Sequence, residues 1–176
     1  MMNYPDESGF TLVELLVVMI ISMILMTIAA LSFRNWIISY NVEAEIKQMY
    51  AEIQSARLRA MEKKRAHFIV FDAAGRTITV VDDTNPAPYG NGTVESSDAV
   101  VKTLVLTNAV SFSDGFPATL SFDPKGMANV GAATGAMCVA SGVGPDYDCL
   151  TIGQSRINMG KLTAQGGCVV ANCQPK

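Results

Sequence analysis

The sequence predicts an α+β fold in which one long N-terminal helix carries a β-rich head. No Pro or Gly occurs between Phe10 and Arg65, so nothing in this stretch breaks a helix. The first half of the stretch is apolar on all sides, and the second half has apolar residues on one stripe only. After residue 67 the pattern changes to short runs of β-branched and aromatic residues separated by turn residues, as expected for strands.

Length and composition limit the chain to one domain with an attached segment. The chain has 176 residues and a formal net charge of −3. This composition lacks the basic excess that is typical of nucleic-acid-binding proteins, and it lacks the low hydrophobicity of disordered chains. We therefore expect one folded head and one N-terminal extension.

A short polar leader, residues 1–9, precedes an apolar stretch that runs without a charge from Leu15 to Phe33. A helix needs about 20 apolar residues to cross the hydrocarbon core, so we expect this stretch to enter a membrane. Three explanations remain open at this point: a cleaved secretory signal, an ordinary signal anchor, and a pilin-type segment. A secretory signal normally has a positive start and a shorter apolar core, and this leader has no Lys or Arg, although Ala30-Leu31-Ser32 could serve as its cleavage tripeptide.

The string Gly9-Phe10-Thr11-Leu12-Val13-Glu14-Leu15-Leu16 resembles the processing site of type IV prepilins and type II secretion pseudopilins. In that family a prepilin peptidase cuts after the glycine and methylates the new N-terminus. The resemblance implies cleavage between Gly9 and Phe10, N-methylation of Phe10, and assembly with other pilin or pseudopilin subunits. Glu14 becomes the fifth residue of the mature chain.

Glu14 is the one charge near the start of this apolar helix. An unpaired carboxylate costs about 2 to 3 kcal/mol deep in a bilayer, and less near a helix end, so a cationic partner is expected. The resemblance suggests the protonated amine of Phe10, within the subunit or from its neighbour. The alternative is that Glu14 marks only the interfacial edge of a transmembrane helix.

The charge of the leader departs from the family pattern. It contains Asp6 and Glu7 where such leaders usually carry Lys or Arg, and Arg34 lies beyond the apolar run. The positive-inside rule therefore does not by itself place the leader in the cytoplasm. The expected location comes from the resemblance: a single pass through the inner membrane, the head outside the cytoplasm, and incorporation into a pilus or pseudopilus.

Residues 10–38 are expected to form the transmembrane and filament-core half of the helix, and residues 39–66 the amphipathic half that continues into the head. The apolar stripe of the second half consists of Val42, Ile46, Met49, Ile53, Ala56 and Ala60. A basic cluster follows at Arg57, Arg59, Lys63, Lys64 and Arg65. It could bind phosphate groups, but we interpret it as a solvated helix end, where cations complement the helix dipole.

Residues 67–160 are expected to form the β-rich head. Strands are predicted at His67–Phe71, Thr77–Val81, Val100–Leu106, Val110–Phe112, Thr119–Phe122, Leu150–Ile152 and Ser155–Met159. The first two should form a hairpin around Ala73-Ala74-Gly75-Arg76. Asp82 and Asp83 are interpreted as solvated turn residues, and His67 as a structural residue without a partner for acid-base chemistry.

Three further strings sharpen the resemblance. The helix-to-strand junction at Ile53-Gln54-Ser55-Ala56-Arg57-Leu58-Arg59-Ala60 is similar to that of the GspH and FimT group of pseudopilins and minor pilins. Leu120-Ser121-Phe122-Asp123-Pro124-Lys125-Gly126 looks like the group's strand-turn motif, and Ser155-Arg156-Ile157-Asn158-Met159-Gly160 is faintly similar to its closing strand. The resemblance implies a type IV pilin-like fold, with residues 161–176 as a Cys-containing C-terminal tail.

All four cysteines, Cys138, Cys149, Cys168 and Cys173, lie in the last quarter of the chain. An even number beyond a membrane segment suggests disulfides formed in an oxidising compartment. Four cysteines allow three pairings. Pairing of neighbours, Cys138 with Cys149 and Cys168 with Cys173, closes the shortest loops. A zinc site is the competing explanation, but no C-x-x-C spacing occurs and His67 is distant in sequence.

No motif for catalysis or phosphate binding occurs: the chain has no GxSxG, GxxxxGK[ST] or HExxH. We therefore expect a structural subunit, not an enzyme, with no cofactor and no metal. The leading hypothesis is a minor pilin of a type IV pilus or a pseudopilin of a type II secretion system. The alternative is a DNA-binding minor pilin of natural transformation, in which Arg156, Lys161 and Lys176 of the acid-free last segment would contact phosphates.

Overall fold

The computed structural model describes residues 9–72, 74, 76–130, 134–163 and 167–176, apart from the side chains of residues 30 and 31. The chain divides into two compact units, residues 1–37 and residues 38–176. One helix and nine strands make up the regular structure of the described residues, together with the short 3-10 helix η1 (Val170–Asn172).

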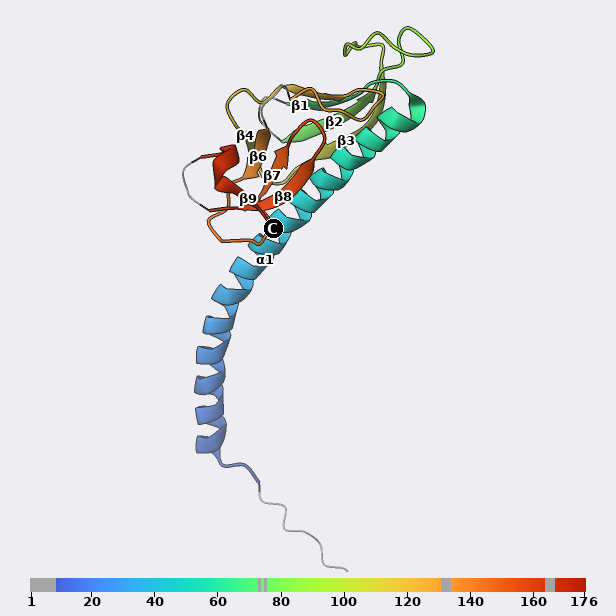
Figure 1. Cartoon of the computed structure of the whole chain (residues 1–176). Helices are drawn as coiled ribbons and strands as arrows, with labels where there is room; N and C mark the ends of the chain where they lie inside the picture. Colours follow the sequence, from blue (N-terminus) through green and yellow to red (C-terminus); the bar gives the residue numbers. More distant parts are fainter. Residues whose placement is uncertain (1–8, 73, 75, 131–133, 164–166) are drawn as a thin grey trace, which may run out of the picture. The chain divides into compact units, whose positions relative to one another are not determined.

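A single helix, α1, runs from Leu12 to Lys63 (Figure 1), as the absence of Pro and Gly predicted. Its first part belongs to the N-terminal unit and has exposed apolar side chains, among them Leu15, Ile20 and Leu25. Its second part belongs to the head, and there the predicted stripe from Val42 to Ala60 is almost fully buried. The amphipathic pattern of the sequence therefore identifies the face of α1 that packs against the head.

Two antiparallel sheets form the rest of the head (Figure 1). The first has the strand order β3-β2-β1-β5 and the second the order β4-β6-β7-β8-β9. In chain order the strands are β1 (His67–Phe71), β2 (Thr77–Asp82), β3 (Ala99–Val105), β4 (Val110–Phe112), β5 (Thr119–Phe122), β6 (Gly135–Val139), β7 (Cys149–Ile152), β8 (Ile157–Leu162) and β9 (Cys173–Pro175).

The main core of the head lies where the stripe of α1 meets both sheets. Ile46, Met49 and Ile53 of the helix are fully buried in the same cluster as Leu120 of the first sheet and Leu150 of the second. Burying a side chain of this kind stabilises the fold by about 1.5 to 3 kcal/mol. Both sheets and the second half of α1 therefore form one cooperative unit.

The expected hairpin is confirmed, because β1 and β2 pair antiparallel from His67↔Asp82 to Phe71↔Ile78. Its predicted turn includes residues 73 and 75, which lie outside the described residues. The expected final pair is also confirmed as β7 with β8. Strand β6 was not predicted, because its Gly and Ala residues have low β propensity.

The last residues differ from the expected tail. Lys161 and Leu162 complete β8, and η1 and β9 follow, with β9 pairing against β8 along Gly160↔Pro175 and Leu162↔Cys173. A three-residue strand that contains Pro has too little periodicity to be recognised in sequence. The C-terminal segment is therefore an integral part of the second sheet.

Candidate functional site

The residues of the expected processing site lie just before α1. Phe10 is 85% exposed, and a side chain added at Gly9 would meet nothing within 4 Å. Residues 1–8 of the expected leader lie outside the described residues. Among the described residues, Gly9 and Phe10 are thus both exposed.

Thr11 and Glu14 form a reciprocal cap at the start of α1. The Glu14 backbone N–H donates to Thr11 Oγ1 at 3.2 Å, and the Thr11 backbone N–H and hydroxyl both lie 3.4 Å from Glu14 Oε2. This is the capping-box arrangement, and its sequence pattern T-x-x-E is present at these positions. The cap holds the Glu14 carboxylate at the positive end of the helix dipole.

The partner expected for Glu14 does not exist in the uncut chain. The nitrogen of Phe10 is then part of the peptide bond to Gly9 and carries no charge. Cleavage between these two residues would convert it into an amine next to the helix start. Within the uncut chain the structure gives Glu14 a partner in Thr11, the residue that follows Phe10.

The first part of α1 is long and apolar enough to cross a membrane, with a mean hydropathy of 2.7 over its most apolar window. None of that window is buried inside the chain. Apolar side chains that find no cover in their own chain need another apolar surrounding, either lipid or other protein. Residues 10–38 are therefore the candidate segment for membrane insertion and assembly.

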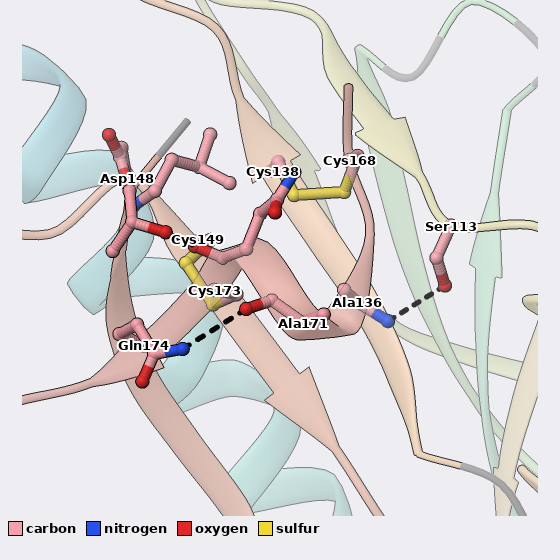
Figure 2. Close-up of a disulfide and its surroundings, with 12 residues drawn as sticks. Ser113, Ala136, Cys138, Asp148, Cys149, Cys168, Ala171, Cys173 and Gln174 are labelled. Atoms are coloured by element: carbon pink, nitrogen blue, oxygen red, sulfur yellow. Dashed lines mark hydrogen bonds between the residues drawn. A yellow bond between two sulfur atoms is a disulfide. The ribbon is translucent and has the colours of Figure 1, made fainter. Parts of the chain in front are cut away.

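Two disulfides lie side by side on the second sheet, Cys138–Cys168 and Cys149–Cys173 (Figure 2). The expected pairing of sequence neighbours is therefore wrong. No cysteine is free, so none is left as a thiolate ligand for zinc. Both disulfides join a strand of the sheet to the C-terminal segment, which they fasten to the sheet.

The second sheet brings sequence neighbours close together, but each is bonded to a cysteine of the C-terminal segment. Cys138 and Cys149 lie directly opposite each other on β6 and β7, and both pack with Cys173 in a small second core. Gly160 of β8 lies opposite Cys149, and a Cβ there would approach Cys173 Sγ to 3.0 Å. The same Cβ would lie 2.5 Å from the Gln174 carbonyl oxygen, so the glycine leaves room both for the backbone of β9 and for the Cys149–Cys173 disulfide, which crosses β8 from β7 to β9.

The observed pairing also constrains the unfolded chain more strongly. Its disulfides close loops with sequence separations of 30 and 24 residues. The chain-entropy relation gives about 3.5 kcal/mol for each of these loops and roughly 2 to 3 kcal/mol for the shorter neighbour loops. The longer crosslinks therefore stabilise the head more than the neighbour pairing would.

An ionic cluster joins the end of α1 to the first sheet. Asp82 accepts hydrogen bonds from Arg65 Nε and Nη2, both at 2.6 Å, and from Lys63 Nζ at 2.7 Å. Asp82 and Asp83 are both buried, so their interpretation as solvated turn residues is wrong. Lys63 and Arg65 are ion-paired with Asp82, although Lys63, like Lys64, is exposed at the helix end.

Burial and charge act in opposite directions in this cluster. Burial alone would raise the pKa of Asp82, but hydrogen bonds from Arg65 and Lys63 outweigh it and leave the pKa lowered. Burial lowers the pKa of His67, which is fully buried as the structural interpretation expected. His67 Nε2 lies 3.4 Å from Asp82 Oδ1 without hydrogen-bond geometry. The neutral imidazole is therefore the favoured form.

Two glutamates on α1 clamp the loops that connect the strands. Glu45 accepts hydrogen bonds from the backbone N–H of Thr107 at 2.6 Å and from Asn108 Nδ2 at 2.8 Å. Glu43 accepts one from the Asp146 N–H at 2.8 Å. These contacts were not predicted, because nothing in the sequence distinguishes a helix glutamate that binds a protein group from one that binds water.

The three cations proposed for DNA binding are not gathered into one patch by the structure. Lys161 Nζ donates to the Gly144 carbonyl at 3.3 Å, and Lys176 forms an ion pair with Asp146. Arg156 lies just before β8, at the opposite end of that strand from Lys161. DNA binding stays a prediction from the sequence.

The chain matches the prokaryotic N-terminal methylation motif over residues 5–30. No curated protein matches the chain in sequence. Among solved structures, it is similar to the type IV minor pilin FimU of Pseudomonas aeruginosa strain PAO1, with a TM-score of 0.51, 16% identity, and coverage of 74% of this chain and 94% of that one. A second crystal form of FimU gives a TM-score of 0.50 at 16% identity, covering 73% and 97%.

A further similar structure is the minor pseudopilin EpsH from the type 2 secretion system of Vibrio cholerae. Its TM-score is 0.51 at 13% identity, with coverage of 70% of this chain and 99% of that one. Likeness at these identities establishes the fold. The predicted α+β architecture of a long helix packed on antiparallel sheets is confirmed.

Proposed function

We propose, from the premise that this chain has a type IV pilin-like fold and the N-terminal methylation motif of prokaryotic pilins, that it is a minor pilin or pseudopilin. The observation that carries the proposal is the division of α1. One half buries its stripe in the head, and the other half leaves apolar side chains without cover in the chain. A subunit that must be held in a membrane and then packed in a filament needs such a helix.

The proposed sequence of events starts with insertion of residues 10–38 into the inner membrane, with the head outside the cytoplasm. A prepilin peptidase then cuts between Gly9 and Phe10 and methylates Phe10. As the filament forms, the exposed apolar side chains of α1 lose their contacts with lipid and pack against the helices of other subunits. The mechanism is structural and non-covalent after processing.

Glu14 is proposed to set the register of assembly. Inside a bundle of apolar helices its carboxylate is stabilised only where a cation lies next to it. The new amine of Phe10, on the same or a neighbouring subunit, supplies that cation. Thr11 holds the carboxylate at the helix start until then.

The first test is the intact mass of the protein isolated from its native membrane. We expect the mass of residues 10–176 plus one methyl group. A Gly9→Val variant, which places a bulky residue at the cut, should retain the leader, and a Thr11→Ser control should be processed. A wild-type chain that keeps residues 1–9 would show that the proposed class is wrong.

The second test separates assembly from helix capping. Glu14→Ala should be cut and methylated but should not enter the filament fraction. Thr11→Ala removes the partner of Glu14 within the chain while keeping the carboxylate, so it should still assemble. Normal incorporation of processed Glu14→Ala would exclude the register role.

A further inference from the structure

The two edges of the first sheet differ in how they are protected. Strand β5 forms one edge, and Asn129 covers it: Asn129 Oδ1 accepts from the Ser121 N–H at 2.9 Å, and the Asn129 N–H donates to the Ser121 carbonyl at 3.1 Å. Asn129 Nδ2 also donates to the Thr119 carbonyl at 3.2 Å. One side chain and its peptide group thus replace a neighbouring strand, which closes this edge to partners.

The edges of the second sheet are short. Strands β4 and β9, its outermost strands, have three residues each, and β9 contains Pro175. Short edge strands and Pro are standard means of preventing pairing with another chain. The free side of β9 therefore offers few peptide groups to a partner strand.

Strand β3 is the exception among the described strands. It has seven residues, contains no Pro, and pairs on one side only, with β2. Val100 and Val105 are 62% and 76% exposed. A bulge in the β2 pairing leaves the run from Lys102 to Val105 in regular register. This edge combines length with exposed apolar side chains, the features that promote strand addition.

The direction of its peptide groups follows from the hydrogen bond after the strand. The Leu106 N–H donates to the Arg76 carbonyl at 2.8 Å, so the peptide groups of Leu106 point toward β2. Successive residues of a strand alternate in this direction. Thr103 and Val105 therefore direct their N–H and C=O groups to the open side, where a partner strand would bind them.

The outer face of the first sheet, next to this edge, carries no charged side chain on the described strands. Lys102, the one charged residue of β3, forms an ion pair with Glu52 of α1 and so faces the helix. On the opposite face of the sheet the register aligns uncharged side chains only: Phe68, Val70, Thr77, Thr79, Val81, Val100, Thr103, Val105, Thr119 and Ser121. An incoming strand with charged side chains on this face would lose hydration without gaining a partner charge.

We propose that β3 is a docking edge for an extended segment of a neighbouring filament subunit, which adds to the first sheet as an outer strand. The segment is uncharged on the side that continues the Val and Thr face. It is not β3 of a second copy, because pairing of two identical strands is two-fold symmetric and closes on itself, whereas a filament needs head-to-tail contacts. The inference rests on the proposed function, since it takes its partner from the filament.

The test uses the full chain in its native filament. The photoreactive amino acid p-benzoylphenylalanine is placed at Val105 or, as a control of similar exposure, at Tyr89, which is 70% exposed on the loop before β3. Each of the two labelled chains is also made with a second substitution. This is either Thr103→Pro, which removes an outward N–H, or Thr103→Val, which keeps it. Filament fractions are irradiated, and adducts are mapped by mass spectrometry.

We expect an adduct from position 105 to an extended segment of another subunit, its loss with Thr103→Pro, and its retention with Thr103→Val. An adduct no stronger than that from position 89, or one that survives Thr103→Pro, would overturn the inference while leaving the proposed function intact. An adduct between two β3 strands would also overturn it. Absence of the processed chain from the filament fraction would overturn both.

Discussion

The two halves of α1 are parts of one unbroken helix, yet they meet opposite conditions. In the head, Ile53 is fully buried against two sheets, whereas in the N-terminal unit Ile20 is 50% exposed. The residue type is the same and the backbone conformation is the same. The difference lies in the periodicity of the neighbouring residues, which is one-sided in the second half and apolar all round in the first.

This difference separates the stability of the head from the capacity to assemble. Side chains in the head half gain their free energy when the chain folds. Side chains in the first half have no cover in the described chain, so they can gain theirs only from another apolar surrounding, either lipid or other protein. Substitutions in the two halves should therefore change different measurements, and the following predictions test that separation from the largest expected effect to the smallest.

Ile53→Ala should destabilise the head by about 4 kcal/mol, because a large side chain leaves a cavity at a site with no exposure. The matched change Ile20→Ala should alter head stability by less than about 0.5 kcal/mol. The measurement is denaturant unfolding of the full chain in detergent micelles, followed by the near-UV circular dichroism of the head aromatics.

Filament incorporation should respond in the opposite order. Ile20→Ala should reduce it at unchanged head stability, since the lost side chain belongs to the exposed surface of α1. Equal unfolding costs for Ile20→Ala and Ile53→Ala would contradict the separation of the two halves.

Removal of the Cys149–Cys173 disulfide by Cys149→Ala with Cys173→Ala should cost about 3.5 kcal/mol of head stability.

Disulfide connectivity itself can be determined from unreduced wild-type protein after trypsin digestion. Cleavage after Lys125, Arg156 and Lys161 places the first two cysteines on one peptide and the last two on another. The observed pairing keeps these peptides joined, and two separate peptides would show pairing of neighbours instead.

Features set by local sequence could be predicted, and features set by distant contacts could not. The length of α1, its buried stripe, and the β1–β2 hairpin follow from periodicity and from the positions of Pro and Gly. Pairing of Cys149 with Cys173 depends on β9 reaching the second sheet, which no local pattern indicates. Loop length alone therefore gave the wrong partner.

The candidate site divides in the same way. Gly9, Phe10 and Glu14 could be proposed from the sequence because the motif that contains them is contiguous, and the T-x-x-E pattern of the Thr11–Glu14 cap is present in the same residues. Burial of Asp82 could not be proposed in this way, because its partners Lys63 and Arg65 come from the helix end before the hairpin. A charge run looks solvated until the fold supplies its counter-ion.

Glu45→Ala should cost about 1 to 3 kcal/mol, because it leaves the Thr107 N–H and Asn108 without their charged acceptor. Lys47→Ala is the matched control on the same helix, since Lys47 is exposed and its pair with Glu43 is a surface pair. That change should stay within about 0.5 kcal/mol. Equal costs by denaturant unfolding would show that Glu45 does not hold the loop to the helix.

The smallest expected effect is a change in how head stability depends on pH. The pKa of His67 is lowered in the folded head by burial, so folding favours the neutral ring. Its contribution is complete above the unfolded pKa of about 6.5 and is lost as the pH falls toward the lower folded pKa. His67→Gln should therefore flatten the fall in stability that begins as the pH drops below about 6.5.

The Asp82 carboxylate should affect head stability in a lower pH range than the His67 imidazole, and this difference distinguishes their contributions. The pKa of Asp82 is lowered in the folded head, where hydrogen bonds from Arg65 and Lys63 outweigh burial, so its contribution is present above about pH 4 and lost below it. His67→Gln should leave this acid limb in place, and Asp82→Asn should remove it. If His67→Gln kept the full slope below pH 6.5, the imidazole would be as well solvated in the head as in the unfolded chain, and the ion cluster would have to open to water at the junction of α1 and β1.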